Sequence, residues 1–317
     1  MSYYLWKAVL GRTPKIEITK DKHDAIIAAW RAISVLADIE EEWDCLVQNY
    51  IDLEMELLGS AMHSMVPNHE SYHELQQIRL GFSRRLSNLL QSCRSYLDHT
   101  PHHLNKLESH TFADPFKKLT NTAYDGHFGY RFMEALRNYA QHRGLPLHGA
   151  SFDAKWMGNL DEGEDDKGLL RHVALASINL AKIKGDKKFS AKLLAEVDGD
   201  LEHLDVATLT REYIEALGGV HGGLRKLLNG ALAEWKSTVR DAIARYAEIN
   251  AGNAIGLSVA EFNKNGRVKS HINIFDDLLL RLERLTRRND SLINLRRRYV
   301  TNELLPPEKS RTRKKTR

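Results

Sequence analysis

The chain has 317 residues, of which 42% are hydrophobic and 28% charged, and its mean hydropathy is -0.45. These values are typical of a globular protein with one large or two smaller domains. No apolar run reaches the roughly 18 residues of a membrane span, and MSYYLWKAVLGRTPK lacks the basic start and apolar core of a signal peptide. We therefore expect a cytoplasmic protein without membrane contact. Two isolated cysteines, Cys45 and Cys93, indicate buried free thiols and exclude a thiolate zinc site.

Basic residues concentrate at the end of the chain. From Arg267 onward there are 15 Lys and Arg against 6 Asp and Glu, a net charge of +9. Because the whole chain carries +4, the preceding 266 residues carry -5. A mildly acidic body with a basic end piece indicates an anionic partner for that end piece, and a solubilising tail is the alternative.

The first hundred residues carry two long helical patterns. Residues 1–20 are expected to be an irregular segment, apart from a short strand over 15–19. Apolar residues spaced three and four apart then predict a helix over 21–64. After Pro67 the same spacing predicts a second helix over 68–98.

A histidine-rich stretch, residues 99–113, is expected to be a polar connector. Pro115 is favourable at a first helical position, so a third helix is predicted from there to His142, loosened near Gly126 and Gly129. Three helices joined by short connections predict an antiparallel bundle.

The chain after the third helix mixes several patterns. Residues 144–168 are expected to form a surface loop, since they lack periodicity and include the acidic run DEGEDD, which does not have the ligand spacing of an EF-hand. Residues 172–183 fit either a strand or a short helix. A helical region over 205–250 is interrupted by GGVHGG at 218–223. This run lacks the GKS or GKT ending of a phosphate loop, so it predicts a turn between two helices.

The last part of the chain predicts a hairpin and a basic helix. Two runs of alternating residues flank Asn265-Gly266, a strong hairpin signal. A helix over 275–304 carries leucines inside and arginines outside, and the basic tail 305–317 is expected to be disordered. The basic helix either binds RNA backbone or pairs through its leucines with another subunit.

The elements together predict a mainly α protein. We expect an antiparallel helical bundle with a small β-hairpin addition and a C-terminal basic helix. The predicted divisions are the N-terminal segment 1–20, a helical domain over 21–250, the hairpin with basic helix over 251–304 and the tail 305–317.

Chemistry-bearing residues gather at the end of the third predicted helix. Numbered at 100° per residue, one arc is apolar and the opposite arc holds Arg131, Glu134, Arg137, Asn138, Gln141 and His142. Gly144 and Pro146 end the helix. An arginine, amides and a histidine on one helix end suit a phosphate, because arginine supplies a fixed fork of donors and histidine titrates near neutral pH.

These residues carry a family resemblance. RNYAQH, from Arg137 to His142, fits an R-x4-H pattern with a polar residue directly after the arginine, at the end of a helix in a bundle. With RRLSNLLQSCRSYLDH and YRFMEALRNYAQHRGLPLHG, the chain resembles the HEPN superfamily, and within it a group of bacterial HEPN-like proteins, over residues 20–150 with the motif core at 68–149.

The resemblance implies a metal-independent endoribonuclease without a cofactor. Such proteins act in toxin–antitoxin, abortive-infection and other antiviral defence systems, commonly as homodimers whose motif helices face each other, so RNA and possible antitoxin or defence partner proteins are implied. In this interpretation His142 is a general acid or base, Arg137 stabilises the phosphate, and Asn138 either orients the His142 ring or bonds the phosphate. RNA or phosphate contacts are expected at Gln141, Arg143, Arg131, Arg296, Arg297 and Arg298.

Three other interpretations remain open. The HEPN fold also occurs without activity, which makes a silent scaffold that dimerises and binds a nucleotide, RNA or protein the alternative function. Arg137 and His142 would then be an ordinary charged pair near the negative end of a helix dipole. A metal site on the histidines between His99 and His148 is a further alternative, but HExxH spacing is missing, so no metal is expected.

Overall fold

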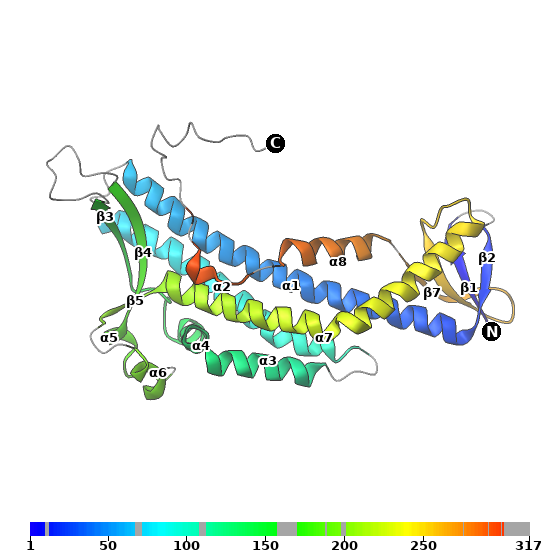
Figure 1. The fold of residues 1–317 in the computed structure, drawn as a ribbon, viewed down its shortest axis with the longest axis horizontal. Helices are drawn as coiled ribbons and strands as arrows, with labels where there is room; N and C mark the ends of the chain where they lie inside the picture. Colours follow the sequence, from blue (N-terminus) through cyan, green and yellow to red (C-terminus); the bar gives the residue numbers. More distant parts are fainter. Residues whose placement is uncertain are drawn as a thin grey trace, which may run out of the picture.

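Three long helices run along the molecule, and a small β-sheet lies at each end (Figure 1). They are α1 (Lys20–Met65), α2 (Tyr72–Leu104) and α7 (Val206–Ile249). The chain is mainly helical, as predicted. The computed structural model describes residues 1–9, 13–66, 72–107, 112–156, 170–187, 189–197, 201–274, 276–290, 292–298 and 300.

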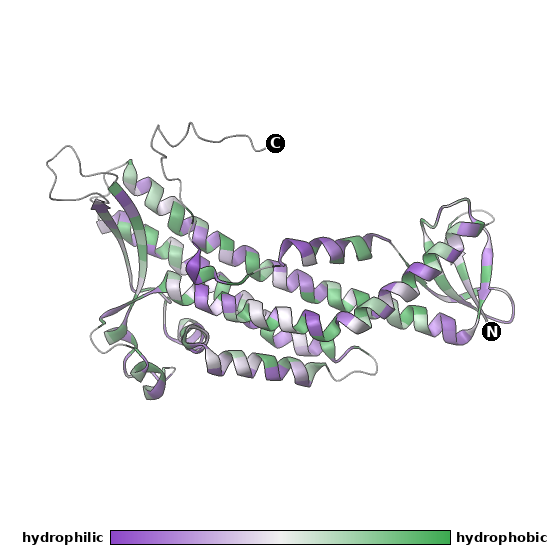
Figure 2. Cartoon of the chain, in the orientation of Figure 1, coloured by the Kyte–Doolittle hydropathy of each residue, from purple (hydrophilic) through white to green (hydrophobic). Residues whose placement is uncertain are grey.

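The helix α1 has the extent that the apolar spacing predicts. Thr19 caps its start, since the Thr19 side chain accepts a hydrogen bond from the amide of Lys22, and Asp21 lies in the first turn. Its buried residues recur three and four apart and pack against α2 and α7. Figure 2 shows such hydrophobic residues alternating with hydrophilic ones along the long helices. No described helix is both long enough and apolar enough to cross a membrane.

The helix α2 is longer than predicted, because it runs through Pro101 to Leu104. Pro101 removes one backbone donor, but Thr100 and Leu104 on either side are fully buried, so tertiary packing holds the last turn in helical form. The predicted polar connector is therefore wrong for residues 99–104. The predicted start of this helix, residues 68–71, lies outside the described residues.

The third predicted helix is in fact two helices, α3 (Ala113–Gly126) and α4 (Phe128–His142). The break is at His127, whose backbone is extended. Arg131 stabilises the break by donating to the carbonyl oxygens of Tyr124 and Asp125 at the end of α3. Both helices pack on α7, and the predicted end at His142 is confirmed.

The predicted turn at GGVHGG is also wrong, because α7 continues through it without interruption. Two of these glycines lie where another segment approaches closely. A Cβ atom on Gly218 would lie 2.9 Å from the carbonyl oxygen of Leu292, and one on Gly223 would lie 2.9 Å from the side chain of Leu119. Close packing against the helix, rather than a turn, therefore accounts for both residues.

The glycines of α7 provide a matched test. We expect Gly218→Ala to lower the free energy of unfolding by about 1–3 kcal/mol, because its methyl group meets backbone that a rotamer change does not move. Gly219→Ala should raise it by about 0.5–1 kcal/mol, since nothing lies within 4 Å of its Cβ position and alanine favours a helix. Urea denaturation of both variants measures the difference, and equal effects would contradict this packing.

The predicted hairpin is confirmed as β6 (Leu257–Phe262) and β7 (Val268–Asn273), with Gly266 at a φ of 71° in the turn. It joins β1 (Ser2–Lys7) and β2 (Lys15–Ile18) in one antiparallel sheet of order β2-β1-β6-β7. The short strand predicted at 15–19 is thus confirmed, whereas β1 lies in residues expected to be irregular. Pairing with a strand more than 250 residues away supplies the partner that makes β1 a strand.

The other sheet has the order β3-β4-β5 and is antiparallel. Its strands are β3 (Gly149–Trp156), β4 (Leu170–Asn179) and β5 (His203–Asp205). The predicted loop over 144–168 is therefore wrong where β3 lies, and residues 157–169 with the acidic run are outside the described residues. Residues 172–183 combine both expected forms, since β4 leads directly into α5 (Leu180–Ile183); the short α6 (Ala191–Ala195) follows.

The last predicted helix is shorter than expected. The helix α8 (Asp276–Arg288) ends before Asn289, which is buried. The side-chain amide of Asn289 donates a hydrogen bond to Asp44, and the backbone carbonyl of Asn289 accepts one from Arg225. The basic residues that follow lie in a 3-10 turn, Leu295–Arg297. The tail 305–317 lies outside the described residues.

Candidate functional site

The motif residues lie on the last turns of α4. Phe132, Met133, Ala135 and Leu136 are buried, as the predicted apolar arc requires. Gln141 and His142, in the opposite arc, are exposed. The residues that carry the HEPN resemblance therefore lie at an accessible helix end that the core holds in place.

Arg137 is held by its neighbour in the sequence. Its Nη1 donates to Asn138 Oδ1 at 3.1 Å, and its side chain is partly buried. Its Nε is buried and has no hydrogen-bond partner among the described residues. The guanidinium group is thus positioned by an amide rather than neutralised by a carboxylate, which leaves its charge available to an anion.

His142 is exposed, and within the described part of the chain its side chain makes no hydrogen bond or ion pair. The backbone N–H of Arg143 satisfies the carbonyl of Tyr139 at the helix end, so the histidine is not used as a side-chain cap. His142 and Asn138 are four residues apart and therefore lie on neighbouring turns of one face.

The other residues expected to bind phosphate are mostly engaged elsewhere. Arg143 pairs with Asp186 at 3.1 Å, Arg131 with Glu196 at 2.5 Å, and Arg296 with Glu215 of α7 at 3.5 Å. Arg297 and Arg298 are exposed, but they lie on the 3-10 turn that packs against α7. Of the predicted residues, Arg137 and Asn138 are in contact, and Gln141 and His142 are exposed about one turn further along α4.

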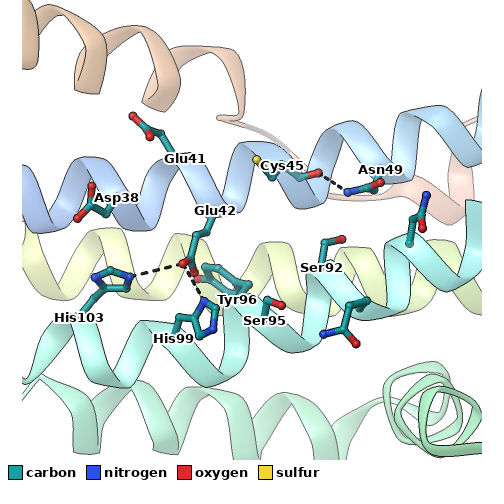
Figure 3. Close-up of a pocket in the computed structure, with 12 residues that line it drawn as sticks. Asp38, Glu41, Glu42, Cys45, Asn49, Ser92, Ser95, Tyr96, His99 and His103 are labelled. Carbon is teal, nitrogen blue, oxygen red and sulfur yellow. Dashed lines mark hydrogen bonds and ion pairs between the residues drawn. The ribbon is translucent and has the colours of Figure 1, made fainter. Parts of the chain in front are cut away.

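Gln141 connects this helix end to a polar cavity. Its Nε2 donates to Gln91 Oε1 of α2 at 3.4 Å, and Gln91 also lines the cavity between α1 and α2 (Figure 3). This open, shallow cavity has a volume of about 700 Å³; its lining residues carry amide, hydroxyl, carboxyl and imidazole groups, but most of its surface is formed by carbon atoms. Its lining residues are Asp38, Glu41, Glu42, Cys45, Asn49, Asn88, Gln91, Ser92, Ser95, Tyr96, His99 and His103.

A carboxylate bridges two histidines of the cavity, His99 and His103 (Figure 3), which lie eight and twelve residues beyond Gln91 along α2. Glu42 Oε1 lies 2.9 Å from His99 Nδ1 and 3.5 Å from His103 Nε2. The histidines share one face because α2 continues through Pro101. This cluster was not predicted, because the predicted helix ends at Asp98; the spacing of four residues between the two histidines was the signal present in the sequence. Across the described residues, no group of three or more His, Cys, Asp or Glu is arranged to hold a metal ion.

A buried ion pair lies behind the cavity wall formed by Tyr96. Glu40 accepts two hydrogen bonds from Arg225, at 2.8 and 2.6 Å, while the Tyr96 hydroxyl lies 2.8 Å from His221 Nδ1. Burial raises the pKa of Glu40, but hydrogen bonds and positive charge from Arg225 and His221 outweigh burial and lower this pKa to about 2. Burial lowers the pKa of His221, while Glu40, whose Oε1 lies 3.3 Å from His221 Nε2, opposes that shift. The His221 ring stacks on Trp43 with 4.4 Å between the ring centres.

Other histidines and both cysteines have structural places. His148 Nδ1 accepts the amide of Asn179, and burial together with nearby Lys182 lowers the pKa of His148, so it joins the chain after α4 to β4 as a neutral ring. Both cysteines are free thiols. Cys93 is buried as expected, whereas Cys45 is exposed at the cavity, which corrects that expectation.

Comparisons of the chain with protein-family models, with characterised proteins and with solved structures found no significant match. The resemblance to the HEPN superfamily therefore depends on the motif residues and on their place at the end of α4.

Proposed function

We propose that the protein is a metal-independent endoribonuclease of the HEPN type, with its site at the end of α4. The observation that carries the proposal is the exposure of His142 together with the contact that fixes Arg137. His142 is exposed and unengaged within the described residues, one turn beyond Asn138, which holds the guanidinium of Arg137. A titratable group and a fixed cation on one helix end are the two components that phosphodiester transfer needs.

The chemistry uses the nucleophile that RNA carries. His142 removes the proton of the 2′-hydroxyl, the 2′-oxygen attacks phosphorus, and the bond to the 5′-oxygen breaks as that oxygen receives a proton. Arg137 stabilises the charge that develops on the phosphate oxygens. The products are a 2′,3′-cyclic phosphate and a 5′-hydroxyl, and DNA is not cleaved because it lacks the nucleophile.

Two proton transfers call for two groups, and a second copy of the chain supplies the second His142. A stripe of exposed apolar residues on α1 supports dimerisation. Its members are Ile51, Met55, Leu58, Met62 and Met65, between 39% and 64% exposed and spaced four, three, four and three residues apart. This spacing is that of a coiled-coil seam, which pairs with a helix of the same spacing.

The cavity between α1 and α2 supports a polar substrate that lies next to the motif. Asn49, Asn88 and Gln91 present amide donors and acceptors suited to base edges and ribose hydroxyls. Asp38 and Glu42 make the opposite end acidic and repel phosphate. The scissile phosphate therefore lies at the Gln91 end, where Gln141 and α4 begin.

A catalytically silent scaffold that dimerises and binds RNA, a nucleotide or a protein is the second candidate. The pairing of Arg131, Arg143 and Arg296 with carboxylates favours it, because these arginines then contribute little to phosphate binding. In either case a cytoplasmic role in bacterial defence or growth arrest, with an antitoxin-like partner, is the setting that the motif suggests.

Incubation of the purified protein with single-stranded RNA in EDTA tests the proposal. We expect cleavage to proceed without metal and to leave 2′,3′-cyclic phosphate and 5′-hydroxyl ends, while a DNA strand of the same sequence stays intact. The native mass of the same sample should be that of a dimer. Cleavage that requires a divalent cation, or products with 3′-hydroxyl ends, would contradict the mechanism; a dimer that binds RNA without cutting it would favour the scaffold.

A further inference from the structure

Within the described part of the chain, the helices pack on one face of the sheet β2-β1-β6-β7 and leave the other face without a helix. Leu5, Ile18, Leu257 and Val259 point to the helices and belong to the main core. Because side chains alternate along a strand, Tyr4 and Trp6 lie on the outer face. Phe262 and Ala260 lie on that face too and are buried without being part of the main core cluster. The outer face therefore has an apolar cluster of its own.

The aromatic rings of this face lie on the two central strands. The ring of Phe262, on β6, makes edge contacts with Tyr4 at 5.1 Å and with Trp6 at 5.8 Å, both on β1. Phe262 is 4% exposed, whereas Tyr4 and Trp6 are only partly buried. Phe262 thus supports the other two rings from below and fixes them in place at the surface.

One cation contacts the rings, and two more lie in the hairpin turn next to Phe262 in the sequence. Lys15 on β2 is exposed, and its Nζ lies 4.3 Å from the centre of the Phe262 ring. It lies 6.0 Å from the centre of the Tyr4 ring and 5.9 Å from that of Trp6, at the outer limit of a cation–π contact. Lys264 and Arg267 are exposed in the turn that follows Phe262. The two segments that form the sheet, residues 1–19 and 253–274, contain six Lys and Arg but two Asp and Glu.

Only one of the two carboxylates of these segments lies on the ring face. Glu261 points to the opposite face and pairs with Lys269 at 2.9 Å, which holds the pKa of Glu261 below its usual value. Glu17 is the cross-strand partner of Tyr4 on β2, so it lies on the ring face at the edge of the sheet, where it offsets part of the positive charge. His271 of β7 borders the rings on the other side, 6.3 Å from Trp6, and is exposed. The ring surface is therefore flanked by positive charge and by hydrogen-bonding groups.

From this arrangement we propose that the outer face of the sheet is a binding platform for single-stranded RNA. Unpaired bases stack on Tyr4 and Trp6, and the phosphates that connect them bind Lys15, Lys264 and Arg267. Aromatic rings that are partly exposed on the central strands of an antiparallel sheet, with cations nearby, are a means by which single strands are bound without dependence on their sequence. A double helix does not fit, because its bases are not free to stack.

The platform lies at the opposite end of the molecule from α4 (Figure 1). It is thus a second RNA-binding surface, distinct from the motif of Arg137 and His142. The proposed RNA binding by this face does not depend on whether the protein cleaves RNA. In an endoribonuclease the platform would hold the substrate strand at a distance from the motif on α4.

Binding of single strands that resist cleavage tests the platform apart from the nuclease. A fluorescent oligonucleotide of about 12 nucleotides, within the range that such surfaces bind, is used as 2′-O-methyl uridine and as deoxythymidine. We expect Trp6→Leu to weaken binding by about 5- to 100-fold in fluorescence anisotropy, the loss of one stacked base. Lys15→Gln should weaken binding more modestly and reduce its dependence on salt.

Trp156→Leu is the control, because Trp156 is likewise a tryptophan on a strand, in the other sheet; it is exposed, whereas Trp6 is partly buried. Circular dichroism melting of each variant shows whether the sheet remains folded, and Trp6→Phe, which keeps a ring, should bind nearly as well as the wild type. The proposal is overturned if the folded Trp6→Leu and Lys15→Gln variants bind the oligonucleotide as tightly as the wild type does. It is also overturned if Trp6→Leu changes only the native mass, since the face would then hold a second copy.

Discussion

His142→Ala should reduce RNA cleavage by about 10²- to 10⁴-fold, the usual contribution of a positioned general acid or base. The side chain is exposed and makes no described hydrogen bond or ion pair, so the substitution should leave the free energy of unfolding unchanged within about 0.5 kcal/mol. Single-turnover cleavage of a labelled RNA strand in EDTA measures the rate, and thermal unfolding measures the stability.

His102→Ala is the matched control, because His102 is likewise an exposed histidine in the last turn of a helix, here α2. It should cleave at the wild-type rate. Arg137→Lys should lose activity although it retains the charge, since lysine does not reproduce the planar fork that Asn138 holds. A His142→Ala variant that cleaves as fast as the His102→Ala variant would remove His142 from the mechanism and, with it, the main support for a HEPN-type nuclease.

The position of the motif was predictable because it depends on local information. The apolar arc of α4, from Phe132 to Leu136, follows from the helical period, and Gly144 and Pro146 mark where the helix stops. The end of α4 at His142 is therefore as predicted. The same reasoning located α1, whose apolar spacing runs without a break from Ile26 to Leu57.

Proline and glycine misled the prediction where distant segments decide the conformation. Pro101 normally ends a helix, but buried neighbours keep α2 helical and so place His99 beside His103. Gly218 and Gly223 have the composition of a turn, yet they lie inside α7 because Leu292 and Leu119 pack where a side chain would be. None of these contacts has a local signal in the sequence.

The other features that the sequence did not predict depend on contacts between residues that are far apart in the chain. Gln91, which joins the motif to the cavity, and Glu42, which bridges two histidines, lie on helices whose relative rotation only tertiary packing sets. The aromatic platform likewise needs β1 to pair with β6, at opposite ends of the sequence. Tyr4 and Trp6 lie in an aromatic run that favours a strand, but nothing local in the sequence indicates that its partner is β6.

The buried ion pair between Glu40 and Arg225 is the site where a substitution should affect stability most. Arg225→Met leaves Glu40, 6% exposed, as a buried charge without its counter-ion, and we expect a loss of about 3–5 kcal/mol in the free energy of unfolding. The double variant Glu40→Leu with Arg225→Met removes the charge as well and should recover most of that loss. Urea denaturation of the single and double variants measures the coupling, and additive losses would show that the pair is not coupled.

The same cluster predicts how stability depends on pH. The pKa of Glu40 is lowered from 4.5 to about 2 in the folded protein, so its ionised form contributes stability above pH 4.5 that is lost as the pH falls towards 2. Since each pKa unit corresponds to about 1.4 kcal/mol, the lowered pKa of Glu40 contributes about 3 kcal/mol to the free energy of unfolding. The pKa of His221 is also lowered from 6.5, because burial disfavours its charged form, so the unfolded chain binds a proton more readily and stability begins to fall below pH 6.5. In the double variant the decline between pH 4.5 and 2 should be smaller by about this amount, while an unchanged decline would assign the acid sensitivity to other carboxylates.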